Sequence, residues 1–192
     1  MITGPTGSGK STFVFKLLPQ LKAQKIYYFY GAFQPLFKKY KKIKFIENLP
    51  DKNFKLNPKF KNVVVLDDLI SDAKSSKVVA DMFTKYSHHA NATVILLSQN
   101  LFSQGSSMRT ISLNTQYFVL FKNPRDKQQI QYLGRQIYGS NYRFLESVYE
   151  HSTKTPFSYL VIDLKQTTKE SERLKTHVLG EKDSVTFYTT KK

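Results

Sequence analysis

The sequence contains no cysteine, few arginines and far fewer acidic than basic residues. Without cysteine the chain can form no disulfide, thiol nucleophile or cysteine-ligated metal site, which suits a reducing compartment. No apolar stretch approaches the length of a membrane-spanning helix, and no signal-peptide pattern is present. From the sequence alone we therefore expect a soluble, intracellular protein without a membrane partner.

The shortage of acidic residues leaves a strong positive charge. The 192 residues include 30 Lys+Arg against 14 Asp+Glu, which gives a formal net charge of +16. A surface of this charge attracts polyanions, and nucleic acid is the first candidate. The alternative is a charge that serves solubility alone. A hydrophobic content of 40% with 23% charged residues indicates one globular domain with a sizeable core.

A glycine-rich motif over residues 4–11 reads Gly-Pro-Thr-Gly-Ser-Gly-Lys-Ser and matches the phosphate-binding loop G-x-x-x-x-G-K-[ST] at every fixed position. Glycines there allow successive backbone N–H groups to point at phosphate oxygens, and the following helix adds its positive dipole end. We expect the Lys10 ammonium to bind the β- and γ-phosphates and the Ser11 hydroxyl to bind Mg²⁺. The predicted ATP-binding residues are Gly4, Pro5, Thr6, Gly7, Ser8, Gly9, Lys10, Ser11 and Thr12.

Apolar runs that alternate with helical patterns predict a three-layer α/β domain with a mostly parallel sheet flanked by helices. Strands are expected at residues 26–30, 44–46, 63–66, 93–97, 117–121, 159–164 and 185–188. Helices are expected at residues 11–18, 34–40, 76–86, 126–138 and 142–149. Because only three residues precede the glycine-rich motif, we expect the first strand to be clipped or the natural chain to begin earlier.

The strand expected at residues 63–66 ends in two carboxylates, Asp67 and Asp68. A buried parallel strand delivers the residues that follow it to the edge of the sheet where ligands bind in open α/β folds. We expect Asp67 to complete the Mg²⁺ shell and Asp68 to polarise the attacking water. The alternative is a strand followed by an aspartate that only caps the next helix.

The next strand ends in a pair of amides, Gln99 and Asn100. A polar amide beside the γ-phosphate can orient water and sense the loss of the phosphate, and we favour Gln99 for this role, with Asn100 capping the turn. Arg109 is expected in a loop at residues 104–110, where it can act as an arginine finger on a neighbouring subunit or contact phosphate or solvent. Arg125 is open to three interpretations: finger, DNA contact or local ion pair.

These motifs, in this order, resemble the FtsK/HerA superfamily of P-loop motor ATPases. Within it, the chain resembles the genome-packaging ATPases of double-stranded DNA viruses of the poxvirus, adenovirus-like and Polinton/Maverick (adintovirus) lineages. The segments that carry the resemblance are residues 2–11, 26–36, 63–69, 88–102, 109–114, 121–126 and 156–163. The relatives often have Asp-Glu where this chain has Asp67-Asp68, and cellular relatives have their finger arginine nearer the strand that holds Tyr117.

The resemblance implies a P-loop NTPase of the ASCE/RecA-like type that forms a homo-oligomeric ring, a pentamer or hexamer. Such a motor hydrolyses ATP with Mg²⁺ and drives double-stranded DNA into a preformed capsid, so a capsid or portal-vertex protein is an implied partner. It works in the virion or at an intracellular site of virus assembly, in the host nucleus or cytoplasm. The resemblance also implies that the strand before Gln99 lies between the loop strand and the Asp67 strand.

We expect residues 1–165 to form the ATPase domain and residues 166–192 a basic C-terminal extension. Two other functions compete with the motor. A small nucleotide or nucleoside kinase also uses a phosphate-binding loop in a chain of this length, but usually carries an arginine-rich lid. A DNA-binding module that holds a nucleotide without turnover is the second alternative.

Overall fold

The computed structural model describes residues 1–51, 53–67, 69, 77–86, 90–102, 106–180 and 185–190. The chain divides into two compact units. The first unit comprises Met1, Ser11–Ser98 and Phe102–Thr115. The second unit comprises Ile2–Lys10, Gln99–Leu101 and Gln116–Lys192.

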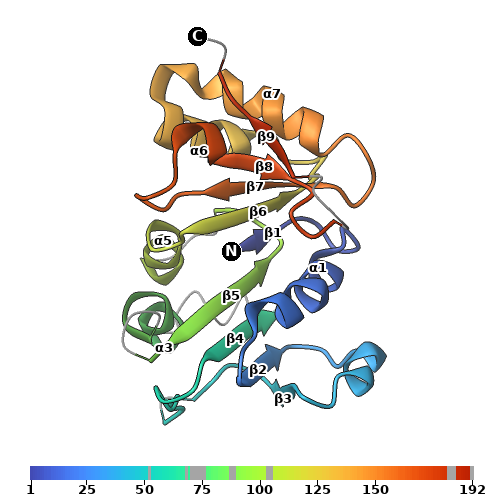
Figure 1. Cartoon of the computed structure of the whole chain (residues 1–192), viewed down its shortest axis with the longest axis vertical. Helices are drawn as coiled ribbons and strands as arrows, with labels where there is room; N and C mark the ends of the chain where they lie inside the picture. Colours follow the sequence, from blue (N-terminus) through green and yellow to red (C-terminus); the bar gives the residue numbers. More distant parts are fainter. Residues whose placement is uncertain are drawn as a thin grey trace. The chain divides into compact units, whose positions relative to one another are not determined.

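A parallel sheet in the order β3–β2–β4–β5 forms the core of the first unit (Figure 1, blue to green). Its strands are β2 (Lys25–Tyr30), β3 (Lys44–Glu47), β4 (Asn62–Asp67) and β5 (Ala92–Ser98). All six residues of β4 are buried, and the strand pairs with β2 on one side and β5 on the other. Because successive side chains of a strand point to opposite faces, the burial of all six shows that both faces of the sheet are covered here, as the continuous apolar run predicts.

Helices of the first unit are short. α1 (Lys10–Leu17) follows the glycine-rich motif directly and continues into a 3₁₀ turn at Leu18–Leu21, in which Pro19 ends the α-helical hydrogen bonding. The helix expected at residues 34–40 is a 3₁₀ turn, Pro35–Lys39. The one expected at residues 76–86 is described as α3 (Lys77–Asp81), which passes into a π-helical segment, Met82–Tyr86.

One prediction in the first unit is wrong: Arg109 does not lie in a loop. It lies in helix α5 (Ser106–Leu113), with its side chain exposed. Met108 and Ile111, three positions apart, are buried on the inner face of that helix. This apolar pair covers less than one helical turn, and the third large apolar residue of the helix, Leu113, is exposed, so the periodicity is too short to be recognised in the sequence.

In the second unit, β1 (Ile2–Thr3) pairs in parallel with β6 (Tyr117–Phe121). The sheet then continues with antiparallel strands, from β6 to β7, β8 and β9 (Figure 1, yellow to red). These strands are β7 (Tyr159–Asp163), β8 (Leu174–Thr176) and β9 (Thr186–Tyr188). Parallel pairing throughout the first unit and between β1 and β6 confirms the predicted α/β class with a mostly parallel sheet.

Helices α6 (Gln128–Tyr138) and α7 (Tyr142–Ser152) also belong to the second unit and are joined by a 3₁₀ turn at Gly139–Asn141. They pack closely because Gly134 of α6 has no side chain: a Cβ there would lie 3.0 Å from the Tyr142 carbonyl oxygen. Within the described ranges, no helix is both long and apolar enough to cross a membrane.

Candidate nucleotide-binding site

The backbone of the glycine-rich motif takes conformations that require glycine. Gly7 has φ of +79° and Gly9 has φ of +101°, in the region that L side chains rarely adopt. Gly4 is required for space, because a Cβ on it would lie 2.7 Å from Phe121 Cβ and 2.8 Å from Ser8 Oγ. The three glycines therefore let the loop turn tightly against the end of β6.

The Lys10 side chain folds back over this loop. Its ammonium donates hydrogen bonds to the Gly4 carbonyl oxygen at 2.6 Å and the Pro5 carbonyl oxygen at 3.0 Å. The Ser8 N–H donates to the same Pro5 carbonyl at 3.2 Å. The positive charge is thus held at the loop itself, where phosphate oxygens would be the stronger acceptors for its N–H groups.

In the first unit, the Ser11 hydroxyl and the Asp67 carboxylate meet. Ser11 is the second residue of α1, Asp67 is the last residue of β4, and Ser11 Oγ donates to Asp67 Oδ2 at 3.3 Å. Asp67 is only 5% exposed. Ser11 is the last residue of the phosphate-loop motif, and Asp67 is the first of the two adjacent aspartates. They are 56 residues apart in the chain, but the fold brings their side chains within hydrogen-bond distance.

A tyrosine that the sequence analysis did not single out also reaches this carboxylate. The Tyr28 hydroxyl donates to Asp67 Oδ2 at 2.5 Å. Burial and then the negative charge of Asp67 raise the pKa of the Tyr28 hydroxyl, so it keeps its proton and remains a donor. Its sequence context, a run of aromatic residues in β2, indicates core packing and gives no sign of a bond to Asp67.

The Tyr28 ring is fixed on several sides. It stacks on Phe15 of α1 with a centroid separation of 5.5 Å and an interplanar angle of 2°. It also packs at 5.3 Å against Phe37 and at 5.3 Å against Phe45. Because the ring has one position, its hydroxyl holds the Asp67 carboxylate in one orientation.

The side-chain oxygens of Ser11 and Asp67 are ligands of the type that Mg²⁺ prefers. Mg²⁺ prefers hard oxygen ligands and in nucleotide sites is held by one or two protein groups, with water and phosphate completing its shell. Across the described ranges, no group of three or more His, Asp or Glu gathers that could hold a metal ion on its own. A hydroxyl and a carboxylate are the two protein ligands that P-loop NTPases offer to Mg²⁺.

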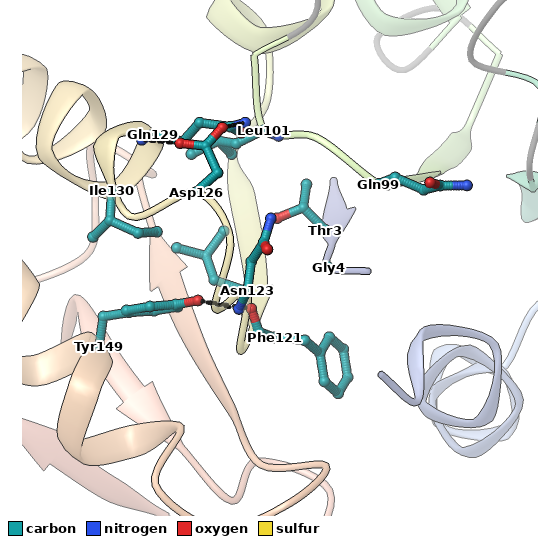
Figure 2. Close-up of a pocket in the computed structure, with 11 residues that line it drawn as sticks. Thr3, Gly4, Gln99, Leu101, Phe121, Asn123, Asp126, Gln129, Ile130 and Tyr149 are labelled. Atoms are coloured by element: carbon teal, nitrogen blue, oxygen red, sulfur yellow. Dashed lines mark hydrogen bonds between the residues drawn. The ribbon is translucent and has the colours of Figure 1, made fainter. Parts of the chain in front are cut away.

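In the second unit, Gly4 and Gln99 line the same small cavity, of about 20 Å³ (Figure 2). This volume holds roughly one water molecule. The amide of Gln99 points away from Asn123 and Tyr149 in Figure 2, and the residue is exposed. The structure thus brings the predicted γ-phosphate sensor beside the first residue of the phosphate loop.

The wall of this cavity opposite Gln99 is held by Tyr149 of α7 (Figure 2). Its hydroxyl donates to the Phe121 carbonyl oxygen at 3.0 Å and accepts from the Asn123 N–H at 2.8 Å. Burial raises the pKa of this hydroxyl. Tyr149 therefore ties α7 to the chain just where β6 ends, a role that its place in a helical pattern did not indicate.

Gln129 of α6 joins the segment around Gln99 to the same wall. The Leu101 N–H donates to Gln129 Oε1 at 2.5 Å. The side-chain amide of Gln129 donates to Asp126 Oδ2, and the Gln129 backbone N–H donates to Asp126 Oδ1 at 3.4 Å. Asp126 thus binds the first turn of α6, and Gln129 holds the chain two residues beyond Gln99.

Two predicted catalytic residues are not placed in this site. Asp68, the expected base, lies outside the described residues. Arg109 lies on α5, as described above, and its side chain is exposed. Of the neighbouring strands, β4 and β5 pair in parallel, with Leu66 opposite Leu96, so Asp67 and Ser98 come at the same edge of the first unit's sheet.

No protein-family model matches the chain, and no curated protein matches it. Solved structures do. The chain is similar to the DNA-packaging ATPase B204 from Sulfolobus Turreted Icosahedral Virus, with a TM-score of 0.59 and 13% identity over 92% of this chain and 94% of that one. It is also similar to the genome packaging NTPase B204 from Sulfolobus turreted icosahedral virus 2 in complex with ATP-gammaS, with a TM-score of 0.57 and 18% identity over 92% and 94% of the two chains.

A further structure of the second protein, in complex with AMP, aligns with a TM-score of 0.53 and 14% identity over 87% of this chain and 92% of that one. Identities this low establish the fold. The chain therefore has the P-loop NTPase fold of viral genome-packaging ATPases, and the resemblance predicted from its motifs is confirmed at that level.

Proposed function

We propose that this chain is an ATP-hydrolysing translocase that moves double-stranded DNA into a viral capsid. The observation that carries the proposal is the contact between Ser11 Oγ and Asp67 Oδ2 at 3.3 Å. It gathers the two protein oxygens that a magnesium–nucleotide site needs at the start of the helix that follows the phosphate loop. The fold likeness to a packaging NTPase in complex with an ATP analogue supports the same conclusion.

Each site residue has a role in this proposal. The loop from Gly4 to Gly9 offers backbone N–H groups to the phosphates, Lys10 neutralises the β- and γ-phosphates, and Ser11 and Asp67 hold Mg²⁺. When bound, Mg²⁺ supplies neutralisation of the charge on the phosphate oxygens. Asp68 takes a proton from the attacking water, and the water oxygen bonds to the γ-phosphorus as the bond from that phosphorus to the bridging oxygen breaks. The electron pair of the broken bond stays on the bridging oxygen, which yields ADP and phosphate.

Two further residues complete the cycle. Gln99, beside Gly4 at the cavity, orients the water and senses the departure of the γ-phosphate. Arg109, exposed on α5, reaches the site of a neighbouring subunit in a ring and stabilises the charge of the transferring phosphoryl group there. The proposed assembly is a homo-oligomeric ring, a pentamer or hexamer, that works with a capsid or portal-vertex protein.

The proposed DNA surface is a lysine cluster in the first unit. Its members are all exposed and comprise Lys38, Lys39, Lys41, Lys42 and Lys44. The cluster is anchored by aromatic side chains: Phe37 stacks on Phe45 at 4.4 Å and Tyr40 stacks on Phe15 at 4.3 Å. Because the backbone between these lysines is fixed, binding a phosphate backbone costs little chain entropy.

The decisive experiment measures ATP hydrolysis by the purified chain with and without duplex DNA, with nucleosides and nucleotides as acceptors in a parallel reaction. The motor predicts hydrolysis that rises with duplex DNA and is abolished in Lys10→Ala. Phosphate transfer to a nucleoside or nucleotide would identify a kinase instead. Nucleotide binding without turnover at any DNA concentration would identify a DNA-binding module.

A further inference from the structure

We propose that Phe157 is the platform on which the base of the bound nucleotide stacks. It lies in the connection between α7 and β7, a segment to which the roles above assign nothing. The inference rests on the proposed function, because it takes a nucleotide to be the ligand of the phosphate loop. It adds the missing half of the site, the part that recognises the base and not the phosphates.

The Phe157 ring lies against the phosphate loop. The position that a Cβ of Gly9 would take is 3.5 Å from Phe157 Cδ1 and 3.6 Å from Phe121 Cε1. Both aromatic side chains belong to the second unit, as does Gly9 itself. A nucleotide whose phosphates are bound by this loop therefore finds an aromatic surface beside the residue that precedes Lys10.

The Phe157 side chain is 70% exposed. A single exposed aromatic residue needs no explanation on its own, but this one is also held in an unfavourable backbone conformation. Its φ is +63°, in the left-handed region that L residues other than Asn and Asp seldom adopt. Backbone strain of this kind persists only where the surroundings enforce it, and it gathers at ligand-binding sites.

The surroundings of Phe157 do enforce its conformation. The Ser158 N–H donates to the Thr155 carbonyl oxygen at 3.2 Å, and Ser158 Oγ donates to the same oxygen at 2.6 Å. Next along the chain, Tyr159 begins β7 opposite Phe121, and the two rings pack at 5.6 Å. The turn is therefore closed by hydrogen bonds and anchored to the sheet, and it presents the Phe157 ring to solvent beside the loop.

A flat aromatic face in water beside a phosphate-binding loop suits one class of ligand, a nucleoside triphosphate. Stacking of a base on an aromatic side chain contributes about 5- to 140-fold in affinity. Every base has a π-face, so stacking alone does not choose among bases. Phe157 thus strengthens the binding of each nucleoside triphosphate and leaves bare polyphosphate unaffected.

The test compares MgATP with magnesium tripolyphosphate, which has the phosphates without the sugar and base. By titration calorimetry, Phe157→Ala is expected to weaken MgATP binding about tenfold, within the range for stacking, and to leave tripolyphosphate binding unchanged. The matched control is Phe187→Ala in β9, where the phenylalanine is 49% exposed, and neither ligand should respond to it. Equal losses for both ligands, or none for MgATP, would overturn the proposal.

Failure of the proposed function has a different signature. A wild-type chain that binds neither MgATP nor tripolyphosphate refutes the nucleotide site and the platform together. A chain that binds both with equal affinity refutes the platform alone. A Phe157→Ala variant that changes subunit association but not MgATP affinity shows that the ring meets a second copy of the chain, and also overturns the platform.

Two more variants separate stacking from a structural role. The chain has no tryptophan, so Phe157→Trp introduces a single indole whose emission should respond to MgATP and not to tripolyphosphate. Phe157→Gly relieves the positive φ that Phe157→Ala retains. We expect Phe157→Gly to unfold at a higher temperature than Phe157→Ala while both lose the same MgATP affinity. If the MgATP affinity of the two variants instead rises and falls with their unfolding temperature, Phe157 acts by stabilising the fold and not by stacking.

Discussion

The Tyr28 hydroxyl donates to Asp67 Oδ2 at 2.5 Å, and the Ser11 hydroxyl reaches the same oxygen at 3.3 Å. Tyr28 lies on β2 opposite Val65 of β4, so its side chain extends along the neighbouring strand to reach the strand's last residue. Two hydroxyl donors on one oxygen orient the carboxylate before any ligand arrives. Tyr28 is therefore a positioning residue for Asp67.

Tyr28→Phe should impair magnesium use without removing a ligand. The ring keeps its packing against Phe15, and only the hydrogen bond to Asp67 is lost. Partners that orient a metal ligand typically change metal affinity or activity about 10- to 100-fold when removed. We expect the Mg²⁺ concentration for half-maximal ATP hydrolysis to rise in this range, with a smaller change in the maximal rate at saturating Mg²⁺.

The control for this variant is Tyr27→Phe, because successive side chains of a strand point to opposite faces of the sheet. Tyr27 packs edge-on against Phe54 at 5.3 Å. Removal of the Tyr27 hydroxyl should leave the Mg²⁺ concentration for half-maximal ATP hydrolysis at the wild-type value. If both variants shift the Mg²⁺ dependence equally, the effect comes from the sheet and not from the bond to Asp67.

Substitutions of Asp67 and Asp68 should have different effects on nucleotide binding and hydrolysis. Asp67→Asn removes the proposed magnesium ligand, so the gain in ATP affinity that Mg²⁺ gives should disappear together with hydrolysis. Asp68→Asn removes only the proposed base, so hydrolysis should fall about 10²- to 10⁴-fold while MgATP still binds. Calorimetry with and without Mg²⁺, beside steady-state turnover, distinguishes them. An Asp68→Asn variant with wild-type turnover would refute its role as the base.

Arg109 should act across a subunit interface. Arg109→Ala is expected to lower DNA-stimulated hydrolysis about 10³-fold or more, the effect of losing an arginine finger. Lys10→Ala inactivates its own site but leaves its arginine available to a neighbour. Mixtures of the two variants should therefore recover activity that neither has alone. Mixtures that stay at the level of the separate variants would show that Arg109 does not act in trans.

Around the proposed site, the sequence predicted local structure best where chemistry demands a fixed spacing. The phosphate loop, the buried run of β4 and the aspartate that ends it could all be recognised, because glycine conformations and double-sided burial leave strict patterns. The contribution of Tyr28 could not be predicted: its hydroxyl meets Asp67 only through the pairing of β2 with β4. Tyr28 and Asp67 are 39 positions apart, and no local sequence pattern around either residue indicates the hydrogen bond between them.

Short strands and helices were also missed by the sequence analysis. β8 has three residues and lies between polar turns, so its alternating Leu-Lys-Thr pattern is too brief to distinguish from a loop. It forms only because β7 offers an edge, with Leu174 opposite Ile162. The helix that carries Arg109 escaped prediction for the same reason, since tertiary packing of its buried face decides the conformation.

Tyr149→Phe should destabilise the fold. The Tyr149 hydroxyl satisfies the Asn123 N–H and the Phe121 carbonyl oxygen at once, and its removal leaves both short of a partner. We expect the free energy of unfolding to fall by about 1–3 kcal/mol, with the melting midpoint lowered by about 2–4 °C for each kcal/mol. Tyr132→Phe, at a side chain of α6 that is 56% exposed, should leave the midpoint unchanged. Equal midpoints for the two variants would contradict the anchoring role.

DNA affinity should depend on salt through the lysine cluster at residues 38–44. For duplex DNA, the logarithm of the binding constant falls linearly with the logarithm of salt concentration, with a slope of about −0.9 for each phosphate neutralised. The double variant Lys38→Gln and Lys41→Gln should therefore reduce the steepness of this slope by about 2. A filter-binding or anisotropy series from low to high salt measures it.

The control for the lysine cluster removes the same charge elsewhere. Lys127 pairs with Glu150 at 3.0 Å and Lys169 with Glu172 at 3.8 Å, both in the second unit. The double variant Lys127→Gln and Lys169→Gln lowers the net charge equally, but these lysines are already paired and lie outside the cluster. Its slope should stay near the wild-type value. If the two double variants flatten the slope equally, DNA responds to the total charge of the chain and the cluster is not its binding surface.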